Sequence, residues 1–162
     1  AGGGIGYGGL NNSVAVELDT YNNGNVDRNN GNHIGISING DVAAVEQTSI
    51  LTRFNNGKVW NVWIDYDGSS QLLEARVSQD SVRPIQATVS STINIPKILG
   101  EKNIFVGFTA ATGLGVENHD ILSWKFQTNE PGLAGVSVYL DTNNNGVLDN
   151  GEPVQVTAVD DP

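Results

Sequence analysis

Apolar and polar residues alternate one by one through several short segments, and this two-residue period constrains the fold more than any other feature of the chain. In SVAVELD (13–19) apolar side chains occupy every second position, and the acids Glu17 and Asp19 stand between them. The segment HIGISING (33–40) repeats the pattern, with three isoleucines on one face and His33 on the other. This period is that of a β-strand that packs one face against an apolar core. The chain is therefore predicted to be built of β-strands.

Five more runs of β-branched and aromatic residues, bounded by glycine, asparagine or proline, carry the same signal. They are KVWNVWIDYD (58–67), LLEARVS (72–78), ATVSSTINI (87–95), NIFVGFTAA (103–111) and DILSWKFQ (120–127). The segment DVAAVEQTSIL (41–51) has the composition of a helical turn, but it is short and uncapped. We expect an all-β fold, a sandwich or a jelly roll.

The chain carries a net charge of −10 and has a pI of about 4.3, and this acidity argues against several kinds of partner. Its 8 lysines and arginines are scattered and form no basic patch, so nucleic acid is not an expected ligand. No apolar run approaches the roughly 18 residues of a membrane-spanning helix, so membrane insertion of this segment is not expected. Carboxylates in loops fit divalent cations better.

Glu17 and Asp19 lie two residues apart on a predicted strand, so both side chains project from one face. Two carboxylates placed in this way repel one another unless a proton or a cation lies between them. His33 begins the next predicted strand, and the loop 20–32 could fold Asn23 and Asp27 back over the acids. Oxygen ligands suit calcium, and the added imidazole suits a transition-metal ion. The alternative is a solvated strand face followed by a flexible loop.

In their order along the chain, SVAVELDTYNN, NHIGISING, WNVWIDYDG, LEARVS, IFVGFTAATG and HDILSWKF resemble the legume-type (L-type) lectins, found in plants and in bacterial surface proteins. The resemblance covers residues 1–127 and implies a jelly-roll β-sandwich that binds carbohydrate. It implies a transition-metal site, for manganese or a similar ion, formed by Glu17, Asp19, Asp27 and His33. It also implies a calcium site formed by Asp19, the carbonyl of Tyr21, Asn23 and Asp27. In that family the two ions brace the loops that bind the sugar.

The same resemblance implies the residues that contact the sugar. The Asn23 amide and the backbone N–H of Gly3 would hydrogen-bond it, and the Tyr21 ring would stack on it. The loop 112–118, with Gly113 and Leu114, would set specificity. The family's sugar-binding aspartate lies upstream of the matched region, so the N-terminal part of the jelly roll is expected to be missing from this chain. The alternative for the glycine-rich start, AGGGIGYGG, is a flexible linker.

The segment DTNNNGVLDNGE (141–152) fits the spacing of a twelve-residue calcium loop. Its ligands would be Asp141, Asn143, Asn145, the carbonyl of Val147, Asp149 and Glu152. Strand-like alternation on both sides argues against a helix–loop–helix site, and GLAGVSVYLDTNNNGVLDNGEP resembles instead the calcium-binding B-type repeats of bacterial surface adhesins. Residues 128–162 are therefore predicted to begin a second, partial β-sandwich module. An asparagine-rich hairpin turn is the alternative.

Three functions remain open from the sequence. The first is a lectin module of an extracellular or cell-surface protein, which binds glycans and is not an enzyme. The second is a jelly-roll glycoside hydrolase, but ELDTYN has Asn22 where the second catalytic glutamate would stand, and Asp65 and Asp67 lead into a turn. The third is a calcium-stiffened spacer that does not bind sugar.

Overall fold

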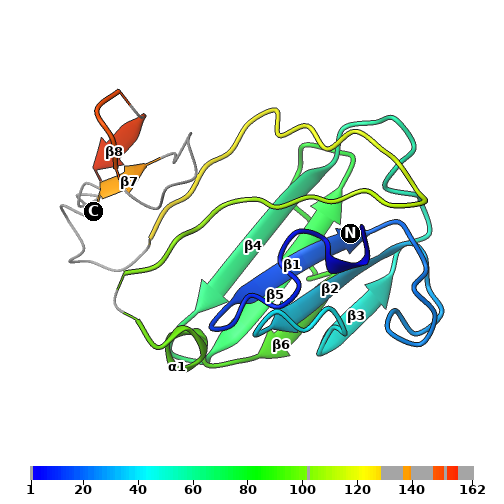
Figure 1. Ribbon diagram of the computed structural model, residues 1–162, viewed down its shortest axis with the longest axis horizontal. Helices are drawn as coiled ribbons and strands as arrows, with labels where there is room; N and C mark the ends of the chain where they lie inside the picture. Colours follow the sequence, from blue (N-terminus) through cyan, green and yellow to red (C-terminus); the bar gives the residue numbers. More distant parts are fainter. Residues whose placement is uncertain (1, 102, 129–136, 140–147, 152, 157–162) are drawn as a thin grey trace. The chain divides into compact units, whose positions relative to one another are not determined.

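The computed structural model describes residues 2–101, 103–128, 137–139, 148–151 and 153–156. The chain divides into two compact units, Ala1–His119 and Asp120–Pro162, and each is described by itself. The first unit contains two three-stranded antiparallel sheets, and Figure 1 shows them lying one over the other.

The first sheet has the order β1-β2-β3, formed by β1 (Val14–Asp19), β2 (His33–Ile38) and β3 (Glu46–Ser49). Its first two strands pair along their full length, from Val14 opposite Ile38 to Asp19 opposite His33. The segment 41–51 therefore contains a strand and no helix, because its second half pairs with β2. The pairing runs from Ile36 opposite Glu46 to His33 opposite Ser49, and this ladder stabilises the strand although its sequence is polar.

The second sheet has the order β4-β5-β6, formed by β4 (Asn61–Asp67), β5 (Leu72–Ser78) and β6 (Val89–Thr92). The core lies between the sheets. Its fully buried members come from β2, β5 and β6, and they are Ile34, Ile36, Leu73, Ala75 and Val89. Val14, Val16 and Tyr66 are among the partly buried side chains packed against them. The prediction of a β-sandwich is confirmed.

Helical structure is minor in the described residues. A 3-10 turn, η1 (Gly2–Gly4), opens the chain, and α1 (Ile95–Leu99) follows β6. The α1 boundaries follow from its sequence: the Asn94 side chain accepts the N–H of Lys97 at 2.9 Å, and Gly100 ends the helix with φ 71°.

The strands predicted at 103–111 and 120–127 are not formed in the described structure. A strand is stabilised by the ladder it makes with a neighbour, and neither segment pairs with a described strand. Their alternating apolar residues are exposed, as Ile104 and Phe108 in one segment and Leu122 in the other show. The first segment is held to the start of the chain by Thr109, whose hydroxyl donates to the Ile5 carbonyl at 2.9 Å.

The second unit contains a two-stranded antiparallel ribbon of β7 (Ser137–Tyr139) and β8 (Val154–Val156). These strands flank the predicted calcium loop, as the alternation on either side of it predicted. In that loop, five of the proposed ligands lie outside the described residues: Asp141, Asn143, Asn145, Val147 and Glu152. Asp149 is described and half-buried. No helix in the described parts of the chain is long and apolar enough to cross a bilayer.

Candidate functional site: a buried acid–histidine cluster beside a loop cavity

The pairing of β1 with β2 sets the positions of the first site residues. Asp19 lies directly opposite His33, and Glu17 lies opposite Gly35, so all four positions share one face of the sheet. This face is turned away from the apolar core, yet Glu17 is 3% exposed, Asp19 8% and His33 1%. The alternative of a solvated strand face is therefore wrong.

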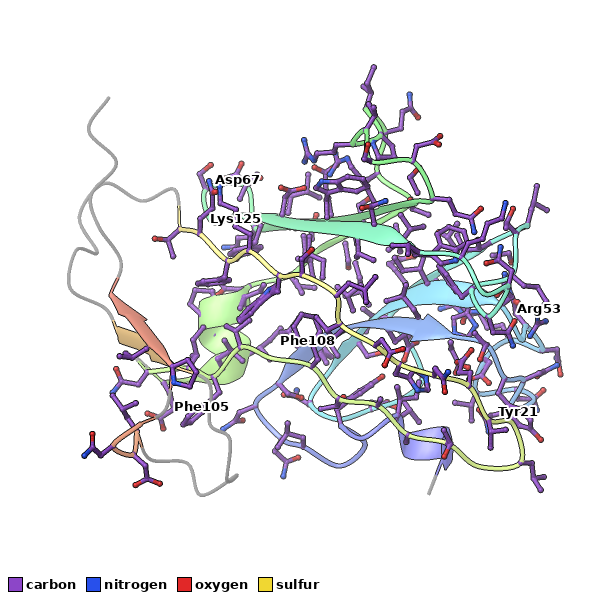
Figure 2. All side chains as sticks on the ribbon, turned by 90° about the horizontal axis from the view of Figure 1, so that it is seen from above. Tyr21, Arg53, Asp67, Phe105, Phe108 and Lys125 are labelled. Atoms are coloured by element: carbon purple, nitrogen blue, oxygen red, sulfur yellow. The ribbon has the colours of Figure 1, made fainter. Side chains whose placement is uncertain are left out.

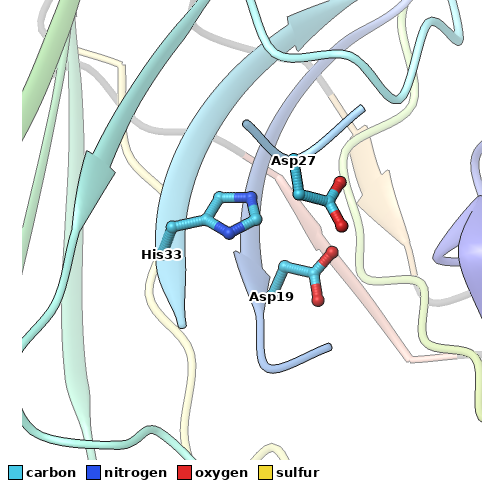
Figure 3. Close-up of side chains that lie close together, drawn as sticks. All are labelled: Asp19, Asp27 and His33. Carbon is cyan, nitrogen blue, oxygen red and sulfur yellow. The ribbon is translucent and has the colours of Figure 1, made fainter. Parts of the chain in front are cut away.

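The loop between the two strands supplies the fourth buried group. The N–H groups of Asp27 and Asn29 both donate to the Gly24 carbonyl, at 3.2 and 2.7 Å, and this tight turn folds the loop over the sheet. Asp27 is 3% exposed, and one of its carboxylate oxygens accepts the N–H of Asn23. Figure 3 shows the result: Asp19, Asp27 and His33 converge, each with a ligand atom within 4.8 Å of the others.

The electrostatics of the cluster are those of a site with excess negative charge. Burial raises the pKa of Asp19, and the neighbouring charges of Asp27 and Glu17 raise it further, although the Tyr21 N–H that donates to Asp19 opposes the shift. Burial lowers the pKa of His33, but the nearby Glu17 carboxylate and the charges of Asp19 and Asp27 outweigh burial, so the net shift is upward. Both shifts indicate a place where additional positive charge is stabilised.

These residues fit a divalent cation. An ion with ligands at about 2.0–2.6 Å holds opposite ligand atoms roughly 4–5 Å apart, which matches the span of the cluster. Two buried atoms, Glu17 Oε1 and His33 Nδ1, have no hydrogen-bond partner among the described residues. Glu17 Oε1 also lies 3.6 Å from His33 Nε2. Buried carboxylates without compensating charge are costly, so the donor set favours bound metal.

Two residues that the sequence analysis did not select hold Glu17 in place. The hydroxyl of Tyr7 donates to Glu17 Oε2 at 2.5 Å, and Tyr7 is itself buried. Burial and the hydrogen bond with Glu17 raise the pKa of Tyr7, so its hydroxyl stays a donor. On the other side, a Cβ at Gly35 would collide with Glu17 Oε1 and would lie 2.9 Å from Ala44 Cβ. The register that pairs Glu17 with position 35 is the signal that could have identified this glycine.

A cavity of about 480 Å³ adjoins the cluster, with Asp19 in its wall. All the predicted sugar-contacting residues line it: Gly3, Tyr21, Asn23, Gly113 and Leu114. They arrive from three loops far apart in the sequence, and glycines allow the close approaches between them. A Cβ at Gly3 would lie 3.2 Å from the Asn23 amide nitrogen, and one at Gly115 would lie 3.2 Å from the Tyr21 ring. The glycine-rich start is thus packed into the site and is not a free linker.

A family model described as the legume lectin domain matches residues 8–146 of this sequence. The chain belongs to the legume lectin family. Bark agglutinin I polypeptide B of Robinia pseudoacacia is 37% identical over 144 residues, which are 82% of this chain and 48% of the agglutinin. The lectin alpha chain of Lablab purpureus is 40% identical over 126 residues, 74% of this chain and 42% of that protein.

The probable L-type lectin-domain containing receptor kinase I.5 of Arabidopsis thaliana is 33% identical over 126 residues, 71% of this chain and 18% of the kinase. The chain therefore spans less than half the length of each of these relatives, all of them plant proteins. The resemblance to L-type lectins is confirmed, and membership of the family indicates a carbohydrate-binding fold.

In this lectin domain, the second pair of acids on one strand has ordinary structural partners. Asp65 Oδ2 accepts from Arg76 at 3.0 Å and also contacts Arg83. Asp67 is the last residue of β4, and its carboxylate accepts from the hydroxyls of Ser69 and Ser70 in the β4–β5 turn at 2.6 and 2.7 Å. These hydrogen bonds, the Ser69 hydroxyl first, lower the pKa of Asp67 to about 2. Neither acid lines the cavity beside the acid–histidine cluster.

Proposed function

We propose that this chain is a calcium-dependent carbohydrate-binding module. The observation that carries the proposal is the cavity of about 480 Å³, because the five residues expected to contact sugar line it together with Asp19 of the acid–histidine cluster. A concave site with a few convergent polar groups beside one exposed ring suits the alternating polar and apolar faces of a sugar.

Each residue has a proposed role in binding. The Asn23 side chain and the backbone N–H of Gly3 hydrogen-bond sugar hydroxyls, and the half-exposed Tyr21 ring packs on an apolar sugar face. Gly113 and Leu114, in the opposite loop, limit which sugars fit. Binding is not followed by a chemical reaction, so the module is not an enzyme.

The metal ligands follow from the same cluster. Calcium would be held by Asp19, the Tyr21 carbonyl, Asn23 and Asp27, and manganese or another transition-metal ion by Glu17, Asp19, Asp27 and His33. Asp19, Asp27 and His33 converge in the structure, and Glu17 lies beside His33. Bound cations would neutralise the buried carboxylates and fix the loop 20–32. The chain's own contribution is already visible in that loop, where Asp19 accepts the Tyr21 N–H at 2.7 Å and Asp27 accepts the Asn23 N–H. These bonds keep the two sugar-contacting residues beside the acids.

The wider role is an extracellular or cell-surface one. The proposal is that the module belongs to a bacterial adhesin or glycan-targeting protein, and that residues 128–162 begin a B-type repeat stiffened by calcium. The β7–β8 ribbon on either side of the loop 141–152 supports this, as does the acidic composition of the chain. If the chain binds no sugar but is still stiffened by calcium, the alternative function of a structural spacer applies.

The test is a glycan-array screen of the chain, and of a version carrying any further upstream sequence its gene encodes, with calcium and with chelator. We expect binding that the chelator abolishes. Replacement of Asn23 by alanine should abolish binding, whereas Asn61→Ala, which removes a hydrogen bond to Asp80 in the second sheet, should not. A folded, calcium-loaded protein that binds no glycan in either form would refute the lectin function.

A further inference from the structure

Besides Tyr21, four residues with acidic or basic side chains line the cavity: Asp19, Arg53, Glu117 and His119. Asp19 belongs to the acid–histidine cluster. Glu117 Oε1 accepts from the Thr20 hydroxyl at 2.7 Å and lies 3.2 Å from His119 Nε2. Arg53 differs from these, because no carboxylate of the described residues lies within ion-pair distance of it. Arg53 is exposed, so its guanidinium is open to a charged ligand from solvent.

The guanidinium of Arg53 is fixed by one edge only. Its Nε donates to Asn55 Oδ1 at 3.0 Å, and Nη2 donates to the Thr20 carbonyl at 2.9 Å. A guanidinium has five N–H donors in a planar fork, so three remain. Two of these, one on each Nη, are parallel and form the end that pairs with both oxygens of a carboxylate.

The loop that carries Arg53 is held rigidly on both sides. The amide of Asn32 donates to the carbonyls of Ile50 and Thr52 at 2.6 and 3.0 Å, and its oxygen accepts the N–H of Phe54 at 3.0 Å. The indole N–H of Trp60 donates to the Phe54 carbonyl at 3.1 Å. The rings of Phe54 and Trp60 also pack edge to face, with their centroids 4.8 Å apart. A charged group fixed in this way loses little freedom when it binds a ligand.

The position of Arg53 relative to the expected sugar contacts completes the geometry. Figure 2 shows Arg53 and Tyr21 at the same end of the first unit, and both line the cavity. Arg53 donates to the carbonyl of Thr20, and Thr20 immediately precedes Tyr21 in the sequence. A ligand in the cavity that contacts Tyr21 therefore shares that cavity with the Arg53 side chain.

We propose that Arg53 selects acidic sugars: the ligand of this site carries a carboxylate, as a uronic acid does, and Arg53 pairs with it. This inference rests on the proposed carbohydrate-binding function and names its ligand class. The net negative charge of the chain opposes anionic glycans at a distance, but at physiological ionic strength charges beyond about 8 Å are largely screened. The contact with Arg53 then decides the preference.

The experiment compares matched neutral and acidic glycosides: methyl glucoside with methyl glucuronide, and methyl galactoside with methyl galacturonide. Dissociation constants are measured by calorimetry at 0.15 M salt for the calcium-loaded full chain. We expect the acidic member of the favoured pair to bind about 10-fold more tightly, in keeping with a charge-assisted two-point contact. The variant R53Q should lose this advantage and keep its affinity for the neutral member.

The control variant is R83Q, which removes the same charge in the segment between β5 and β6, where Arg83 contacts Asp65 of β4. It should keep the preference for the acidic member. Equal binding of neutral and acidic sugars by the unmodified chain, or a preference that R53Q retains, would refute the role of Arg53 and leave the lectin function standing. Failure of every glycoside and every arrayed glycan to bind would refute both.

Discussion

Tyr7 offers the sharpest test of the acid–histidine cluster, because Tyr7→Phe keeps the buried ring and removes only the hydroxyl. That hydroxyl donates to Glu17 Oε2 at 2.5 Å, and the Glu17 side chain is 1% exposed, so water cannot replace the lost donor. A buried hydrogen bond to a charged group contributes about 1.5–3 kcal/mol to the free energy of unfolding. We expect the variant to lose about 2 kcal/mol, which lowers Tm by roughly 4–8 °C in a chain of this size.

The hydroxyl also orients a proposed metal ligand, so a second effect is expected. With Oε2 held by Tyr7, Glu17 Oε1 stays 3.6 Å from His33 Nε2, at the edge of the cluster. Residues that orient metal ligands in this way typically change metal affinity by about 10–100-fold when they are replaced. Tyr7→Phe should therefore weaken manganese binding by at least about 10-fold.

The assay is urea denaturation with metal and with chelator, together with calorimetric titration of manganese and calcium into metal-free protein. The matched control is Tyr66→Phe, whose hydroxyl donates to the Ile93 carbonyl at 3.1 Å in the second sheet. The control should lose about 1 kcal/mol and keep its metal affinity. If Tyr7→Phe also keeps its metal affinity within twofold, then Tyr7 only stabilises the fold and does not orient Glu17.

Further predictions concern the metal, the Arg53 loop and the β4–β5 turn. When the metal is present at about 100 times its Kd, its removal by chelator should lower the free energy of unfolding by roughly 2.7 kcal/mol and Tm by about 5–10 °C. An unchanged melting curve in calorimetry would contradict a metal site. Asn32→Ala removes three buried hydrogen bonds and should cost about 2–4 kcal/mol by urea denaturation, a prediction that a loss below about 0.5 kcal/mol would overturn. In an NMR titration the pKa of Asp67 should lie at about 2, and Ser69→Ala should move it toward 3.8. Because a lowered pKa stabilises only the ionised carboxylate, the contribution of Asp67 to folding stability is present above about pH 4 and is lost as pH falls toward 2.

The local alternation of residues was enough to predict most of the sandwich. β1, β2, β4, β5 and β6 all lie within the segments whose side chains alternate or are β-branched. The segments predicted wrongly are those whose conformation depends on pairing with a neighbouring strand. β3 has the polar sequence EQTS and is a strand only because β2 pairs with it, whereas NIFVGFTAA has the sequence of a strand and belongs to none of the described sheets. Strand propensity measures fit to a pleated neighbour more than an intrinsic preference of the backbone.

The site separates in the same way into what spacing can reveal and what it cannot. Asp19 and His33 are found from one hairpin, because a strand, a loop and a second strand determine which residues face each other. Tyr7 contacts Glu17, which lies ten positions further along the chain. The loop that carries Arg53 is held by the amide of Asn32, twenty-one positions upstream. The alternation of polar and apolar residues along the sequence does not reveal contacts of this kind. They depend on hydrogen bonds between loops, and these are the residues through which lectins that share one sheet architecture could differ in the sugars they select.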